Sequence, residues 1–141
     1  MKQPFAEYCA ATGEFEPIDL AFADFMLRFA RAPECEELYL AALFASRAVR
    51  LSHSCCPLRE LAGTLFPETP AEGQRQFRLP GCDAWLERLS APALAAAVSR
   101  YPACRDAGFP TPLAIDDAGR LYLQRYLVYE LQVAQAVMLR A

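Results

Sequence analysis

The chain has 141 residues, of which 55% are hydrophobic and 22% charged, and its formal net charge is −3. This apolar composition excludes a disordered chain, and the length fits a single domain over residues 1–141. The net charge lacks the basic excess that is typical of nucleic-acid-binding domains. No stretch of sequence reaches the ~20 consecutive apolar residues that span a bilayer. The N-terminal residues also lack the apolar segment of a secretory signal peptide. We therefore expect a soluble, cytoplasmic protein.

The first predicted helix covers residues 18–31. Its aromatic stripe has the spacing of one apolar helix face and consists of Phe22, Phe25, Met26 and Phe29. Such a stripe belongs either to the core or to a ridge that binds a partner, and we interpret it as core.

A second helix is predicted over residues 34–50, with Glu residues at its start and Arg residues at its end, which complements the helix dipole. Its middle, residues 38–45, is apolar on nearly all sides, as is typical of a central, buried helix. A short strand is expected over residues 53–56, and a short helix over residues 58–62, where Gly63 is a plausible stop.

Residues 66–73 and 79–81 are rich in Pro and Gly and predict loops. A helix starting at Cys82 or Asp83 carries Trp85, Leu86 and Leu89, and the Ala-rich residues 93–101 predict another helix.

The last third of the chain predicts a β-hairpin followed by a long C-terminal helix. Apolar residues alternate on both sides of Asp116-Asp117-Ala118-Gly119, and Asp and Gly favour a tight turn. The helix is expected from about Leu123 to the end, without a stop signal, so we expect the chain to be part of a longer protein. The predicted fold class is mostly α, with a small hairpin and a long C-terminal helix.

Six cysteines are present, but no C-x-x-C pair, and His53 is the only histidine. Zinc sites need clustered ligands, so we expect reduced thiols and no metal site. His53 and Cys55 would share a face if they lay on a strand, which leaves a small thiol or metal protein as one alternative.

Catalytic machinery is missing from the residue inventory. Lys2 is the only lysine and has no glycine-rich loop before it, so no P-loop is present. Asp116 and Asp117 could form a carboxylate pair, but aspartates in such a turn ordinarily cap backbone groups or are solvated, which is the interpretation we favour. We expect no catalytic, cofactor-binding or metal-binding residue in this chain.

The order of helices, short strand and hairpin also resembles a winged helix, which raises the alternative of a nucleic-acid-binding module. The helix that would read DNA offers Arg59 but also Glu60, and the hairpin tip is acidic. A scaffold is the better interpretation of this arrangement.

Two blocks of sequence, residues 40–58 and 110–134, resemble the N-terminal domain of RecD, the alpha subunit of exodeoxyribonuclease V (RecBCD). The residues at positions typical of that family are His53, Cys55, Arg120, Leu121, Tyr122, Leu123, Arg125, Tyr126, Glu130, Val133 and Ala134. Ser52, Cys56 and Leu127 depart from the family pattern.

The resemblance implies that the chain is the non-catalytic assembly domain of an ATP-dependent 5′–3′ DNA helicase subunit that acts in double-strand break repair. ATP and Mg²⁺ are then expected only in motor domains downstream. The implied partners are RecC-like and RecB-like subunits and the chain's own helicase domains, with DNA reached only through the full complex. Within this hypothesis, Tyr122, Arg125, Tyr126 and Tyr129 are the predicted interface residues.

Overall fold

The computed structural model describes residues 5, 7–8, 14–100, 111–123 and 137. In chain order its elements are the helices α2 (Pro17–Phe29) and α3 (Glu36–Arg50), strand β1 (Cys56–Pro57), helix α4 (Leu58–Leu61), strands β2 (Leu65–Phe66) and β3 (Phe77–Arg78), helix α5 (Cys82–Leu89), the 3-10 helix η1 (Pro92–Leu94), and strands β4 (Val98–Arg100), β5 (Leu113–Ile115) and β6 (Arg120–Leu123). None of the helices in these ranges has the length and apolar character needed to cross a lipid bilayer.

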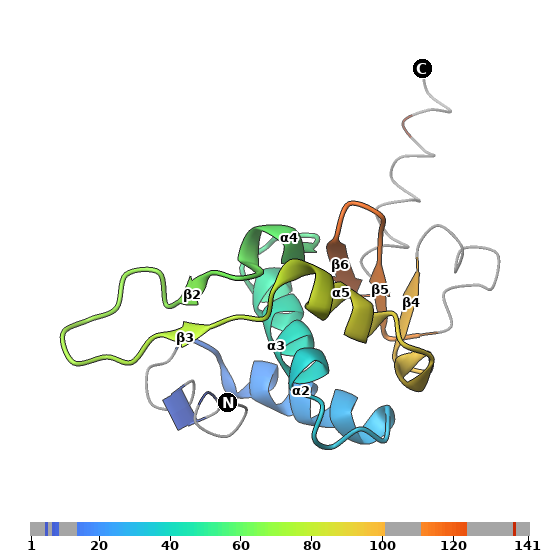
Figure 1. The fold of residues 1–141 in the computed structure, drawn as a ribbon, viewed down its shortest axis with the longest axis horizontal. Coiled ribbons are helices and arrows are strands. Elements are labelled where there is room, and N and C mark those ends of the chain that lie inside the picture. The colour runs from blue at the N-terminus through green and yellow to red at the C-terminus, as the bar shows by residue number, and fades with distance from the viewer. Residues whose placement is uncertain (1–4, 6, 9–13, 101–110, 124–136, 138–141) are drawn as a thin grey trace.

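Helix α3 is the centre of the fold. Its residues from Leu38 to Ala45 are all buried, as the apolar run predicts. Helix α2 packs along one side of α3, and the sheet and α5 pack against other sides (Figure 1). The domain therefore has α3 at its centre, with α2, the sheet and α5 packed around it.

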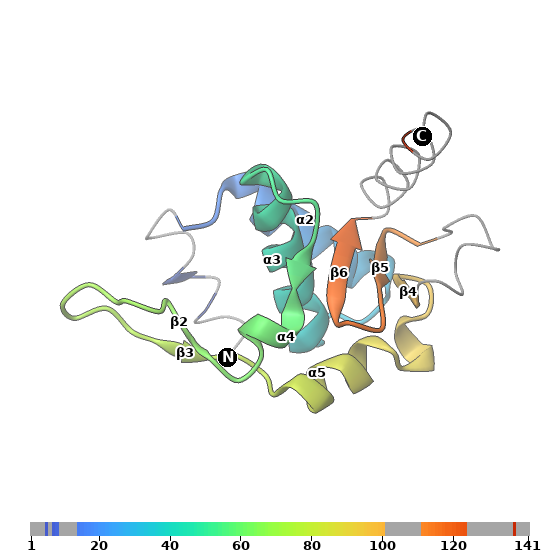
Figure 2. The same ribbon diagram turned by 90° about the horizontal axis from the view of Figure 1, so that it is seen from above.

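The predicted mostly-α class is wrong, because a four-stranded sheet in the order β1-β6-β5-β4 covers α3. Figure 2 shows β6, β5 and β4 side by side, with β1 beyond β6. The hairpin is confirmed as the antiparallel pair of β5 and β6. The strand expected over residues 53–56 is shifted, because β1 covers Cys56–Pro57. Strand β4 is three residues long, too short for alternating hydrophobicity to predict it.

The helix predicted over residues 93–101 is also wrong. The chain forms η1 and then β4, which pairs in parallel with β5 and places Val98 opposite Leu113. Ala97 and Val98 are buried by this pairing. Tertiary pairing here outweighs the helix propensity of the alanines.

The predicted long C-terminal helix lies outside the described residues, apart from Val137. Its expected start, Leu123, is the last residue of β6 instead. A winged helix does not describe the sheet either, since β4 adds a parallel strand to the hairpin's outer edge.

Strands β2 and β3 form a separate two-stranded ribbon that projects from the body (Figures 1 and 2). An aromatic cluster packs where the ribbon meets α3. Its edge-to-face contacts include Phe44 with Phe66 at 5.2 Å and Phe5 with Phe77 at 5.0 Å between ring centroids. These contacts fix the base of the ribbon on the core.

The hairpin turn is held against α4. Gly119 has φ +76°, and its carbonyl accepts a hydrogen bond from the Leu58 N–H at 3.0 Å. The Arg59 side chain lies over Gly119, with its Cγ 2.5 Å from where a Cβ would stand.

We expect Gly119→Ala to lower the free energy of unfolding by about 2–3 kcal/mol, through left-handed backbone strain and displacement of Arg59. Gly73→Ala is the matched control, because Gly73 has the same φ of +76° and no atom within 4 Å of the added Cβ. It should cost only about 1 kcal/mol. Urea unfolding measures both, and equal losses would show that the contact with Arg59 adds nothing.

Candidate functional site

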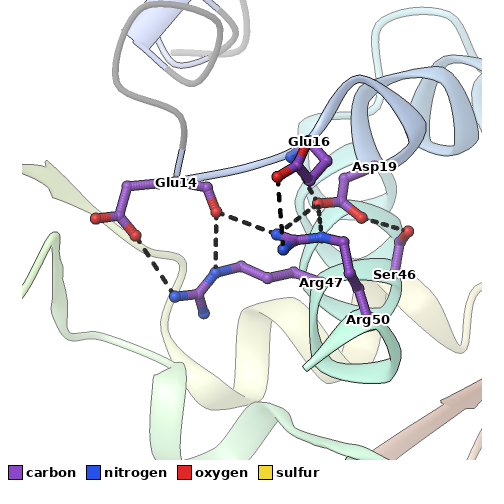
Figure 3. Close-up of polar contacts among 6 residues, drawn as sticks. All are labelled: Glu14, Glu16, Asp19, Ser46, Arg47 and Arg50. Carbon is purple, nitrogen blue, oxygen red and sulfur yellow. Dashed lines mark hydrogen bonds and ion pairs between the residues drawn. The ribbon is translucent and has the colours of Figure 1, made fainter. Parts of the chain in front are cut away.

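A buried carboxylate fastens α2 to α3. Asp19 on α2 is 0% exposed. It accepts hydrogen bonds from Ser46 Oγ at 2.7 Å, from Arg50 Nε at 3.1 Å and from the Glu16 backbone N–H at 2.9 Å, and its ion pair with Arg50 Nη2 spans 3.0 Å (Figure 3). Such saturation is what a buried charge requires. Asp19 therefore holds α2 in one rotation on α3.

The neighbouring arginines complete the same network. Arg47 Nε and Arg50 Nη2 donate to the Glu14 carbonyl at 3.2 and 3.4 Å, and Arg47 also pairs with the Glu14 carboxylate at 3.5 Å (Figure 3). The Arg47 guanidinium lies 5.6 Å from the Phe15 ring centroid. These polar groups bind one another and the segment before α2, so we assign them a structural role.

With Asp19 turned inward, the neighbouring flank of α2 presents an apolar ridge. The α2 ridge consists of Ile18, Phe22, Phe25 and Phe29, spaced four, three and four residues apart. Ile18 is 65% exposed, Phe25 46% and Phe29 45%, while Phe22 is half-buried. The Phe25 and Phe29 rings contact each other, with centroids 5.7 Å apart.

The prediction that the aromatic stripe is core is thus confirmed for Met26 and wrong for Phe25 and Phe29. The core face of α2 consists of Asp19, Ala23, Met26 and Leu27. Sequence reasoning missed this face because it contains a charged residue and an alanine. The four-three-four spacing of the ridge was visible, but spacing does not say which of two adjacent stripes points inward.

A second apolar surface is a groove of about 1190 Å³ between the end of α3, the chain leading into β1, α4 and the β2–β3 ribbon. Its lining includes the exposed leucines Leu51 and Leu65, together with His53, Cys55, Glu60 and Arg78. Charges of both signs line it, which gives it no preference for a strongly charged ligand.

The residues of the thiol or metal alternative are placed in this groove. His53 is exposed and lies before β1, not on a strand, and its backbone N–H donates to the Ala48 carbonyl at 2.8 Å. No group of three or more His, Cys, Asp or Glu side chains arranged to hold a metal is found among the described residues. Cys35, Cys55, Cys56 and Cys82 are free thiols.

Cys56 is shielded more than its neighbour Cys55. It is 2% exposed in β1, and burial raises the pKa of its thiol from 9.0 to about 12, with the adjacent Cys55 adding to the shift. The protonated thiol is favoured in the folded state. Its contribution to the free energy of unfolding is therefore complete below pH 9 and is lost as the pH rises from 9 to about 12.

We therefore expect iodoacetamide at pH 8 to modify Cys56 at least tenfold more slowly in the folded protein than in urea, since the thiolate is the reactive form. A Cys55→Ser variant removes the competing neighbour, and peptide mass spectrometry follows the modification. Equal rates in the folded and unfolded protein would contradict the assigned burial.

Of the two acids in the hairpin turn, Asp116 has the capping role expected from the turn. Asp116 accepts hydrogen bonds from the backbone N–H groups of Ala118 and Arg120 at 3.0 and 2.9 Å and from Arg120 Nε at 2.7 Å. Asp117 is exposed and pairs with Arg100 at 3.3 Å.

The helix that would read DNA in a winged helix is engaged by the protein itself. Helix α4 has four residues, and Arg59 Nη2 donates to the Asp117 carbonyl at 3.4 Å while its side chain covers Gly119. A reading helix must present its side chains to a groove of the duplex. The Arg59 contacts favour a scaffold role for this helix.

The predicted interface residues are placed only in part. Tyr122 lies on β6 and is 6% exposed in this chain. Arg125, Tyr126 and Tyr129 lie outside the described residues. Their role in an interface stays a prediction.

An exposed aromatic ridge on a small mixed α/β domain is a feature typical of a domain that contacts other proteins. Residues 11–122 match the family described as RecBCD enzyme subunit RecD, N-terminal domain, and the chain belongs to this family. The resemblance seen in the sequence is confirmed by this match. A comparison with curated proteins finds no significant match.

Proposed function

We propose that this domain is the assembly module of a RecD-type subunit of a RecBCD enzyme, and that it has no catalytic role of its own. The observation that carries the proposal is the exposed α2 ridge, in which two phenylalanine rings and an isoleucine face solvent. Small domains rarely expose clustered aromatic side chains unless another surface covers them. Membership in a family of subunit domains supplies the context for such a surface.

The parent subunit is, on this proposal, an ATP-dependent 5′–3′ DNA helicase that acts in double-strand break repair in the cytoplasm. Its ATP and Mg²⁺ sites would belong to the motor domains. The partners of this domain are RecC-like and RecB-like subunits and the motor domains of the same chain. The polar clusters described above support this division of labour, because Asp19, Asp116 and Arg59 are engaged in internal contacts.

Competition for the partner subunits tests the proposal. Tagged full-length subunit is bound to an excess of the cognate RecB–RecC pair, and this 141-residue chain is added in increasing amounts. We expect the chain to displace the full-length subunit in a saturable manner. No displacement at a hundredfold excess, by a chain whose folding is verified by circular dichroism, would contradict the proposal.

A nucleic-acid-binding module remains the second candidate from the sequence, and the structure offers no observation that favours it. A gel shift with duplex DNA at low salt distinguishes the two, since binding through phosphates strengthens as salt falls.

A further inference from the structure

The α2 ridge has the geometry of a seam that accepts one helix. Positions spaced four, three and four residues apart lie within a narrow stripe along an α-helix, as in the contact line of a coiled coil. All four members are large and apolar, and the Phe25 and Phe29 rings form one continuous surface at 5.7 Å.

The size of the ridge indicates a heterologous partner. Because large aromatic side chains present about 150–250 Å² each, the exposed parts of Ile18, Phe25 and Phe29 amount to roughly 300 Å². A stable interface uses about 800 Å² from each partner. The ridge alone is therefore too small to hold two copies of this domain together, but it suits the apolar centre of a contact with a larger chain.

Charge around the ridge indicates the chemistry of that partner. Arg28 lies in the last turn of α2, and Arg31 lies just after the helix. Both side chains are exposed, and neither forms an ion pair with another described residue. Asp24 is the exposed acid of the same helix. Because successive residues are about 100° apart around a helix axis, Asp24 lies further from the ridge than Arg28 does. An acidic border on the partner would complement the two arginines.

The position of the ridge separates it from the sheet. Helix α2 packs along α3, and β6, from which the chain continues beyond Leu123, packs against another side of α3 (Figures 1 and 2). Strand β6 does not pack along α2, so the chain that continues from Leu123 starts away from the ridge, which favours a second polypeptide as the partner.

We propose that the α2 ridge binds a surface helix of a partner subunit, one whose apolar stripe is bordered by Asp or Glu residues. This inference rests on the proposed assembly function and names the contact through which it works. The helix covers Ile18, Phe25 and Phe29 and brings its acids to Arg28 and Arg31.

Site-specific photocrosslinking identifies the occupant. p-Benzoyl-phenylalanine replaces Phe25 in the full-length subunit, the complex with RecB and RecC is assembled and isolated, and irradiation follows. We expect a crosslink to a helical, acid-bordered peptide of one partner subunit. A crosslink within the same chain, a crosslink to a second copy, or no crosslink in the isolated complex would each overturn the proposal.

Paired variants measure how much the α2 ridge contributes to binding of the partner subunits. Phe25→Ser/Phe29→Ser in the full-length subunit should weaken binding to the partner pair at least tenfold, because truncation of central aromatic anchors is costly. Leu51→Ser/Leu65→Ser is the matched control, since it removes two exposed apolar side chains at the groove, and it should change binding less than threefold. A ridge variant that binds within threefold of the native subunit, or equal weakening by both pairs, would overturn the proposal.

The assembly function and the ridge contact can be tested separately. If this chain competes for the partners but the Phe25→Ser/Phe29→Ser variant competes equally well, the assembly function stands and the ridge contact is wrong. If the native chain does not compete at all, the assembly function itself is wrong. Arg28→Glu tests the acidic border: we expect several-fold weaker binding at low salt, and unchanged binding would exclude an acidic partner at this position.

Discussion

Replacing Asp19 by alanine is expected to lower the free energy of unfolding by about 3–5 kcal/mol. The carboxylate is fully buried and is the shared partner of Ser46 and Arg50, so its removal leaves an arginine of α3 without its inward partner. A loss of this size is a large fraction of the stability of a domain of this length. Urea unfolding followed by circular dichroism measures the change.

Two further variants test the physical cause. Asp24→Ala removes a carboxylate from the exposed face of the same helix and should change stability by less than about 0.5 kcal/mol. The triple variant Asp19→Leu/Ser46→Ala/Arg50→Met replaces Asp19 and its two side-chain partners by apolar groups and should recover most of the loss. If Asp19→Ala and Asp24→Ala had equal effects, the network would not be what fastens α2 to α3.

Replacing Trp85 by alanine should also cost about 3–5 kcal/mol, because a fully buried indole is removed from the contact between α5 and α3. Trp85 Nε1 donates a hydrogen bond to the Glu37 carbonyl at 2.9 Å. Trp85→Phe keeps part of the ring but loses this bond, so we expect a loss of about 1–3 kcal/mol. Thermal unfolding measured by calorimetry gives both values.

Glu87→Ala is the control on the same helix, since Glu87 is exposed and its removal should change stability by less than about 0.5 kcal/mol. The order Trp85→Ala, Trp85→Phe, Glu87→Ala is the expected ranking of the losses. A Trp85→Phe variant as unstable as Trp85→Ala would mean that the hydrogen bond, and not the ring volume, anchors α5.

The parts of the fold that sequence reasoning predicted are those with a long or chemically distinct signal. The central helix is predictable because eight successive apolar residues run from Leu38 to Ala45, and the hairpin because Asp116 and Gly119 favour a turn between alternating strands. Strand β4 was not predictable, since three residues after an Ala-rich stretch carry little strand signal. Its strand conformation depends on pairing with β5, which is a tertiary contact.

The candidate site also combines a feature that is predictable from the sequence with one that depends on tertiary contacts. The stripe of Phe22, Phe25 and Phe29 is evident in the sequence, and both of its interpretations, core or partner-binding ridge, follow from spacing alone. The rotation of α2 decides between them, and that rotation depends on the pairing of Asp19 with Arg50, thirty-one residues away. No local pattern relates these two residues.

The most direct test of the assembly role is reconstitution with and without this domain. The full-length RecD-type subunit and a version lacking residues 1–123 are each mixed with RecB and RecC, and mass photometry counts the ternary complexes. We expect the shortened subunit to unfold cooperatively, which verifies its folding, but to form no ternary complex at concentrations where the full-length subunit is fully bound. Ternary complexes in equal amounts from both subunits would contradict the proposal that this domain is the assembly module.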